Sequence, residues 1–291
     1  GGHTDAVLCV GWWPDGSCVA SGSAVCKIRI WDATTGEVRR ILEGQTDGVL
    51  SVSWSPDGLM LASGSDDNLV RIWSAISGKL LHSIEEHTSS VLSVSWSPDG
   101  KTLASGSHDD TVRIWDAASG RLLGSLEGHT DSVLSVCWSP DGKTIASGSG
   151  DNIVRIWDAS GGRLVRSFKG HTTAVESVRW SPDGSAIASG SSHSGVSIWD
   201  AGSGDLLRSL EGHITSIRTV RWSPNDTALA SGSDDNSVKI WDADSGNLMF
   251  ALKGHSDSVW SVDWSPDGSA LASGSDDNTV RIWDAASGSL L

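Results

Sequence analysis

Residues 255–284 read HSDSVWSVDWSPDGSALASGSDDNTVRIWD, and the chain repeats this pattern every 42 residues. The last tryptophan of the stretch belongs to a series with that step: Trp31, Trp73, Trp115, Trp157, Trp199, Trp241 and Trp283. A second tryptophan series keeps the same step: Trp12, Trp54, Trp96, Trp138, Trp180, Trp222 and Trp264. A fixed period in this range is the signature of a repeat architecture. We therefore expect seven copies of one structural unit, forming a single domain over residues 1–291.

Local patterns in the quoted stretch predict short strands joined by tight turns. The segment 265–268 is Ser-Pro-Asp-Gly, in which proline presets φ and glycine accepts a positive φ, so it predicts a turn. The segment 279–283 alternates apolar and polar residues, which is typical of a strand with one buried face. Residues 269–275 predict another strand, and the last strand of a repeat is seen whole at 121–127. Each repeat therefore predicts four antiparallel strands, although the seventh ends early in its fourth.

The first strand of the repeat departs from strict alternation. Its constant apolar residues Val259, Val262 and Trp264 are spaced by three and then by two. One extra residue in that interval indicates a β-bulge, which turns a side chain toward a new face. The residue that the bulge turns is Trp260.

A histidine at the start of the repeat, Ser-Pro-Asp-Gly, Ala-Ser-Gly-Ser-Asp-Asp and Ile-Trp-Asp together resemble the WD-repeat β-propeller family, over the whole chain. A four-stranded sheet cannot bury both faces alone, and radial stacking of sheets solves this problem. The resemblance implies an all-β fold, a closed seven-bladed propeller of four-stranded antiparallel blades. Its repeats start near His3, Gln45, His87, His129, His171, His213 and His255.

In this family a hydrogen-bonded set of His, Ser, Asp and Trp ties each blade together. The resemblance carries this tetrad onto four repeats: His87, Ser105, Asp109, Trp115; His129, Ser147, Asp151, Trp157; His213, Ser231, Asp235, Trp241; and His255, Ser273, Asp277, Trp283. Three repeats depart, with Val25 and His193 in place of Asp and Gln45 in place of His. We expect those blades to be weaker, because each unpaired buried partner costs about 1–3 kcal/mol.

The recurring Ser, His and Asp could also suggest a hydrolase. Nucleophilic catalysis needs an exposed serine beside a base and an oxyanion pocket. A trio that recurs at equivalent positions of several repeats favours a structural role instead. The Asp-Asp-Asn turns, as at 66–68, lack the distal Glu of a calcium loop. We predict no catalytic residue, no metal site and no cofactor.

The informative positions vary while their repeat frame stays constant. By the resemblance, the bulge position and the residue before the turn Asp surround the central channel on the top face, where propellers of this family hold peptide partners. The candidate partner-binding residues are Leu8, Leu50, Leu92, Leu134, Glu176, Arg218 and Trp260 at the bulge, with Asp66, His108, Asp234 and Asp276 before the turn Asp. Repeats five to seven replace Leu with Glu, Arg and Trp, and Trp and Arg are typical interface anchors. Neutral drift after duplication is the alternative explanation.

Composition narrows the classes of partner. The formal net charge of −15 argues against a nucleic-acid or anionic-membrane surface, which needs a basic face. The four cysteines show no metal-type spacing, which indicates free thiols in a reducing compartment, cytoplasmic or nuclear. The two ends of the chain show no overlap that would complete one blade from both termini. We therefore expect ring closure by packing between blades one and seven only, with fraying there.

These observations predict a non-catalytic scaffold that binds protein or peptide partners, as a monomeric domain of a larger protein or complex. Three alternatives stay open. One is the ligand-sensing C-terminal propeller of a larger nucleotide-binding signalling receptor. The others are a consensus-like or engineered propeller with no native partner, and an enzyme sited at the channel mouth.

Overall fold

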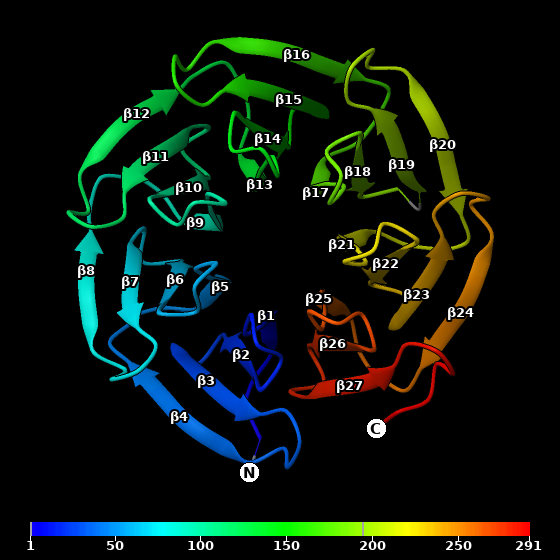
Figure 1. Cartoon of the computed structure of the whole chain (residues 1–291), viewed down its shortest axis with the longest axis horizontal. Helices are drawn as coiled ribbons and strands as arrows, with labels where there is room; N and C mark the ends of the chain where they lie inside the picture. The colour runs from blue at the N-terminus through cyan, green and yellow to red at the C-terminus, as the bar shows by residue number, and fades with distance from the viewer. Residues whose placement is uncertain (1, 194) are drawn as a thin grey trace.

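Seven antiparallel sheets surround a central channel in the computed structural model, which describes residues 2–193 and 195–291 (Figure 1). The all-β seven-bladed propeller is thus confirmed. The strands of blades one to four are β1 (Val7–Trp12), β2 (Cys18–Ser23), β3 (Lys27–Asp32), β4 (Val38–Glu43), β5 (Val49–Trp54), β6 (Met60–Ser65), β7 (Val70–Ser74), β8 (Leu80–Ile84), β9 (Val91–Trp96), β10 (Thr102–Ser107), β11 (Val112–Asp116), β12 (Leu122–Leu126), β13 (Val133–Trp138), β14 (Thr144–Ser149), β15 (Ile153–Asp158) and β16 (Leu164–Lys169). Those of blades five to seven are β17 (Val175–Trp180), β18 (Ala186–Ser191), β19 (Gly195–Asp200), β20 (Leu206–Glu211), β21 (Ile217–Trp222), β22 (Ala228–Ser233), β23 (Ser237–Asp242), β24 (Leu248–Lys253), β25 (Val259–Trp264), β26 (Ala270–Ser275) and β27 (Val280–Asp284).

Blade seven differs from the other six. Its sheet contains three strands over the described residues, and the expected start of a fourth strand at Ser289 forms only an isolated bridge between Trp283 and Leu290. In Figure 1 the C-terminus lies beside blade one, where the chain begins. In the described residues the ring therefore closes between the three-stranded sheet of blade seven and the four-stranded sheet of blade one.

The predicted turn and bulge are both present in the repeat. Gly268 has a φ of 72°, and the Asp267 carboxylate accepts hydrogen bonds from the Ser269 amide at 3.0 Å and the Ser265 hydroxyl at 2.6 Å. The β25–β26 register shifts between Val259 and Ser261, and the inner strand pair of each of the other six blades has the same shift. The bulge prediction is confirmed, and it places one side chain per blade outside the regular ladder.

The apolar core lies between neighbouring blades rather than within one sheet. One cluster joins Val112 and Leu126 of blade three to Val133 and Trp157 of blade four, and similar clusters connect the other neighbours. Neighbouring blades can approach each other this closely because the second strand of each blade contains a glycine. A methyl group on Gly106 would lie 2.7 Å from Val133 Cγ1, which is closer than side chains pack.

Hydrogen bonds between the first strands of neighbouring blades add to this packing. A serine hydroxyl on the first strand of one blade accepts the backbone N–H of a valine in the next, as from Val136 to Ser93 at 3.1 Å. Blades seven and one share this bond, because Val10 donates to Ser261 at 3.1 Å, and the Trp12 amide donates to Asp263 at 2.8 Å. The expectation of closure by packing alone is therefore wrong: polar contacts also join the ends of the ring.

No helix among the described residues has the length and apolar character needed to cross a membrane.

Candidate functional site

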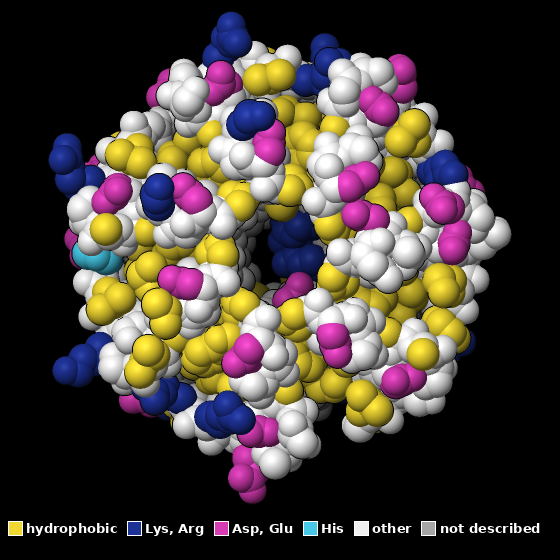
Figure 2. Space-filling model, in the orientation of Figure 1, with side chains coloured by type: hydrophobic (Ala, Val, Ile, Leu, Met, Phe, Trp, Pro, Cys, Tyr) yellow, Lys and Arg dark blue, Asp and Glu magenta, His cyan; other side chains and the backbone are white. Residues whose placement is uncertain are grey.

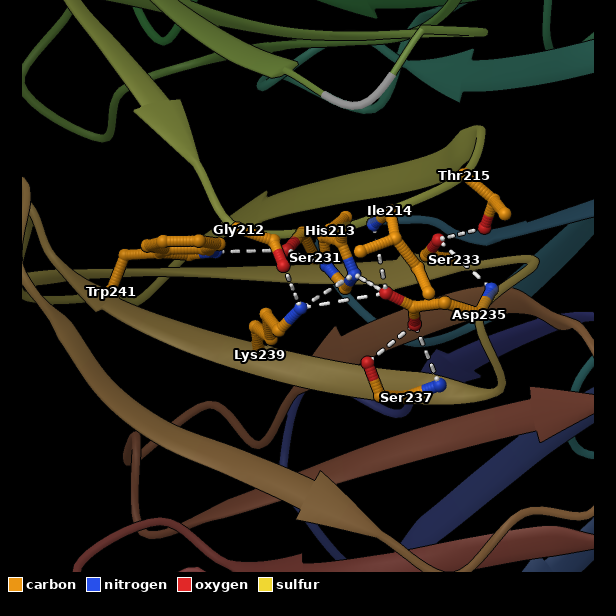
Figure 3. A network of polar contacts seen from close by, with 10 residues as sticks. All are labelled: Gly212, His213, Ile214, Thr215, Ser231, Ser233, Asp235, Ser237, Lys239 and Trp241. Atoms are coloured by element: carbon orange, nitrogen blue, oxygen red, sulfur yellow. Dashed lines mark hydrogen bonds and ion pairs between the residues drawn. The ribbon is translucent and has the colours of Figure 1, made fainter.

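The tetrad residues form buried hydrogen-bonded chains inside four blades. In blade six, His213 Nδ1 lies 2.7 Å from Asp235 Oδ2 and its Nε2 lies 2.8 Å from Ser231 Oγ (Figure 3). The Trp241 indole N–H donates to the same hydroxyl at 2.8 Å. Blades three, four and seven contain the same set of contacts. Ser231 is fully buried and its oxygen is already engaged, so the set has no exposed nucleophile.

Lysine and arginine side chains extend some of these chains. Lys239 Nζ donates to the Gly212 carbonyl at 2.5 Å and lies 3.4 Å from Asp235 Oδ2, as Figure 3 shows. In blade four Arg155 Nη1 contacts Asp151 Oδ2 at 2.6 Å, and the same carboxylate oxygen lies 2.9 Å from His129 Nδ1. One aspartate can therefore hold a histidine and a cation together.

Two of the three departing repeats leave buried atoms of the set without partners. His3 Nδ1 and both amide atoms of Gln45 are buried and have no hydrogen-bond partner among the described residues. His171 keeps its bond to Ser189, at 2.6 Å, while His193 Nδ1 contacts the Ser192 carbonyl at 3.1 Å instead. Burial lowers the pKa of His171 to about 4, and burial with the charge of Arg29 lowers the pKa of His3 to about 4 as well. Both histidines are neutral at physiological pH.

The structure brings the seven bulge residues together around the mouth of the central channel. All of them line one cavity of about 80 Å³: Leu8, Leu50, Leu92, Leu134, Glu176, Arg218 and Trp260. Each is half-buried. Because the four leucines come from consecutive blades, the mouth has an apolar half and a polar half. We call this set of seven the mouth ring.

Arg218 in the polar half is already held by carboxylates. Its Nε and Nη2 bind the two oxygens of Asp234 at 2.9 and 2.7 Å, and its Nη1 lies 3.6 Å from Glu176 Oε1. Burial opposes its charge, but these two acids raise the pKa of Arg218 above its ordinary value. The guanidinium lies 4.4 Å from the Trp260 ring, while the buried Trp260 Nε1 has no partner in the described structure.

The remaining residues predicted before the turn Asp do not line the cavity. Asp66 and His108 are exposed on their turns, and His108 Nδ1 contacts Ser132 Oγ at 2.6 Å. Asp276 is half-buried, and its charge reaches Arg218. Of the four residues predicted before the turn Asp, Asp234 is the one that bonds directly to a side chain of the mouth ring.

A charged group deeper in the channel was not assigned a role by the sequence. Arg179 binds the Ser135 hydroxyl at 3.1 Å and the Val178 carbonyl at 2.6 Å, and it bonds to no carboxylate among the described residues. Arg221 Nε lies 3.4 Å from Asp263 Oδ1. Burial and the nearby charge of Arg221 lower the pKa of Arg179 to about 9, so it stays positive at neutral pH.

Burial also raises the pKa of Asp263, against the effect of Arg221. Figure 2 shows basic side chains inside the central opening. The sequence signal for this group is the position three residues after the bulge, which is small in repeats one to four and charged in repeats five to seven.

A model described as the WDR19 first beta-propeller matches residues 134–291, and a WD domain, G-beta repeat model matches residues 1–32, 36–74 and 78–116. The nuclear distribution protein nudF of Emericella nidulans and that of Aspergillus niger are each 50% identical to this chain over 42 residues. That stretch is 14% of this chain and 10% of each relative, so the similarity spans about a tenth of their length.

The described ranges contain no cluster of side chains suited to binding a metal ion. No group of three or more His, Cys, Asp or Glu residues there could hold a metal ion. The cysteines are free; Cys9 and Cys18 are buried, while Cys26 and Cys137 are partly buried. Burial raises the pKa of Cys9 to about 12, so that thiol stays protonated.

Proposed function

This chain belongs to the WD-repeat β-propeller family, which is generally non-catalytic and typically binds proteins, and from that premise we propose that it binds an extended peptide of a partner protein across the mouth ring. We also propose that it works as one domain of a larger protein, as a family model named for a first propeller suggests.

The observation that carries the proposal is the division of the mouth ring. Leu8, Leu50, Leu92 and Leu134 lie on consecutive blades and are half-buried, so a side chain of the peptide that covers them would bury more of their apolar area, which stabilises a complex by about 25 cal/mol per Å². The opening of about 80 Å³ is large enough for a side chain and too small for a folded segment. The peptide therefore lies across the mouth and inserts one residue.

The polar half determines the kind of peptide. Trp260 Nε1 is a buried donor without a partner, so a peptide carbonyl that reaches it gains a hydrogen bond at little desolvation cost. Arg221 is paired with Asp263, whereas Arg179 bonds to a hydroxyl and to backbone carbonyls, and the charge of Arg179 favours an acidic side chain in the channel. We propose a peptide with an apolar residue for the leucine half and an Asp or Glu for the channel.

Arg218 has a supporting role in this proposal. Its charge is neutralised within blade six by Asp234, so it holds Trp260 in place and does not itself bind the peptide. This differs from the sequence-based expectation, in which Arg218 and Trp260 are both partner-binding residues.

The test is selection of peptides from a displayed random library, followed by fluorescence anisotropy with the purified chain. We expect Trp260→Ala and Leu92→Glu each to weaken binding at least tenfold, equivalent to about 1.4 kcal/mol. Leu81→Glu is the matched control, because Leu81 is 47% exposed on the outer strand β8 and should leave the affinity unchanged. Selected peptides that bind equally to all four proteins would favour neutral drift at the mouth ring.

A further inference from the structure

The turn between β18 and β19 in blade five lacks a carboxylate that four other blades hold on two N–H groups. In blade six, Asp235 Oδ2 lies 2.7 Å from His213 Nδ1 and accepts the backbone N–H of Ile214 at 3.4 Å (Figure 3). Blades three, four and seven hold an aspartate oxygen on the same two groups. Blade five has His193 at the aspartate position, and its Nδ1 contacts the Ser192 carbonyl instead. The fold therefore presents these two groups in blade five without the acceptor that they have elsewhere.

The first of the two groups is His171 Nδ1, and its hydrogen bonds determine where its proton lies. The buried Ser189 hydroxyl oxygen lies 2.8 Å from Trp199 Nε1 and 2.6 Å from His171 Nε2. An indole N–H can only donate, so Ser189 accepts from Trp199 and gives its own proton to His171 Nε2. Burial lowers the pKa of His171 to about 4, so the ring is neutral and its single proton is on Nδ1. His171 Nδ1 is therefore a donor, and among the described residues no acceptor bonds to it.

The second group is the backbone N–H of Thr172, which corresponds to that of Ile214 and has no acceptor in the described ranges. His171 and Thr172 both line a cavity of about 390 Å³. His171 is half-buried, whereas the histidines of the four complete tetrads are at most 7% exposed. Blade one also lacks the aspartate, but its His3 Nδ1 is fully enclosed. The donor pair of blade five can therefore be reached by a ligand from solvent.

A second departure from the repeat gives this cavity its room. Ser197 of β19 occupies a position that is a long cation in the other six blades: Arg29, Arg71, Arg113, Arg155, Lys239 and Arg281. In blade four that cation contacts the aspartate directly, from Arg155 Nη1 to Asp151 Oδ2 at 2.6 Å. Ser197 pairs with Ser209 across β19 and β20, and both serines line the cavity. Blade five thus replaces both large groups of this place by short ones and adds two hydroxyl groups to the cavity wall.

Blade seven shows which kind of acceptor such donors stabilise. Asp277 lies 2.8 Å from His255 Nδ1 and accepts the backbone N–H groups of Ser256 at 3.1 Å and Thr279 at 3.0 Å. Within the described ranges it forms no ion pair with a lysine or arginine. Burial opposes its charge, but the bonds from Thr279 and His255 lower the pKa of Asp277 below its ordinary value. N–H and hydroxyl donors in this arrangement therefore hold an ionised carboxylate without a paired cation.

We propose that blade five binds the carboxylate group of a ligand, with one oxygen accepting the His171 Nδ1 proton and the Thr172 N–H. The hydroxyls of Ser197 and Ser209 in the same cavity are further donors. Glu211 is exposed on the cavity wall, and its charge repels an anion, so the affinity is weak. The carboxylate belongs to a small free ion or to an aspartate side chain of a polypeptide. The cavity shares no lining residue with the channel, so this site does not depend on peptide binding at the mouth ring.

The experiment titrates sodium acetate into the ¹⁵N-labelled chain at neutral pH, with sodium chloride adjusted to keep the ionic strength constant, and follows backbone amide resonances. We expect a saturable downfield shift of the Thr172 amide proton, because that N–H gains a carboxylate acceptor. Thr130 is the internal control, since its N–H already bonds to Asp151 at 3.2 Å and should not respond. No saturable shift of Thr172 up to about 0.5 M acetate, or an equal shift of Thr130, overturns the proposal.

The variant His193→Asp supplies the carboxylate from the chain itself. We expect its Thr172 amide proton to lie downfield without acetate, its melting temperature to rise, and its response to acetate to disappear. A folded variant that responds to acetate as the original chain does contradicts the assigned site. If the variant does not fold, the comparison of Thr172 with Thr130 in the original chain decides the question by itself.

A second titration identifies the source of the carboxylate. It uses aspartate blocked as N-acetyl aspartate N-methylamide, with the blocked asparagine as the matched control. Binding of the blocked aspartate at least tenfold tighter than that of acetate supports a polypeptide side chain, and equal or weaker binding supports a small free ion. Blocked asparagine that binds as tightly as blocked aspartate contradicts a carboxylate site.

Discussion

Replacing Gln45 by histidine should stabilise the protein by completing the tetrad of blade two. The other three members are present, because Trp73 Nε1 donates to Ser63 at 2.9 Å and Asp67 accepts the Thr46 amide at 3.0 Å. Gln45 itself has two buried polar atoms without partners. A histidine at this position has the Ser63 hydroxyl and the Asp67 carboxylate within reach. These are the two kinds of partner that the histidine has in the complete blades.

The magnitude follows from the two unpaired atoms. A buried polar group without a partner costs about 1–3 kcal/mol, and partial relaxation reduces the recovery. Arg71 Nη2 lies 2.8 Å from Asp67, but blade four shows that one carboxylate holds both a histidine and an arginine. We expect Gln45→His to add about 2 kcal/mol to the free energy of unfolding, which raises the melting temperature by about 4–8 °C.

The assay is thermal and urea denaturation at pH 7.5, with the reciprocal substitution His87→Gln as the matched control. Blade three has a complete tetrad, with His87 Nδ1 at 2.7 Å from Asp109 Oδ2, so His87→Gln should lower stability by a similar amount. If Gln45→His leaves the midpoint unchanged or lowers it while the variant remains folded, the buried tetrad does not determine blade stability and the reasoning fails.

The remaining predictions concern pH, close packing and ring closure. His171 is held neutral with a pKa of about 4 by burial, against an ordinary value of 6.5, so the unfolded chain binds more protons as pH falls and stability is lost between about pH 6.5 and 4. His171→Gln should therefore cost about 1 kcal/mol at pH 7.5 and make the pH dependence in that window shallower; an unchanged slope would exclude this residue as a cause. Gly106→Ala should destabilise by about 1–3 kcal/mol because its methyl group meets Val133, whereas Gly124→Ala, which meets no atom within 4 Å, should be neutral in the same urea titration. Amide hydrogen exchange should be fastest in β27 and the strands of blade one, and uniform protection around the ring would contradict that.

Most residues of the site were predictable from the repeat, but which of their side chains bond to one another was not. The bulge position identifies Arg218 and Trp260 because every repeat carries the same extra residue in its first strand. The bond from Arg218 to Asp234 joins residues 16 positions apart across β21 and β22, and periodicity alone says nothing about which of the variable side chains will meet. Arg179 was visible as a departure from the small consensus residue, yet its position in the channel depends on how the blades curve together.

The sequence by itself determined the number of repeats, the strands, the turns and the bulge, since each follows from residues close together within one 42-residue period, and the family resemblance implied the four complete tetrads. Only the tertiary structure decided how blade seven meets blade one, because that contact joins the two ends of the chain and no repeat contains it. The bonds from the Val10 amide to Ser261 and from the Trp12 amide to Asp263 both arise at this junction. Local sequence patterns reflect the conformational preferences of neighbouring residues. Closure of the ring instead depends on the sum of the small rotations between all the blades.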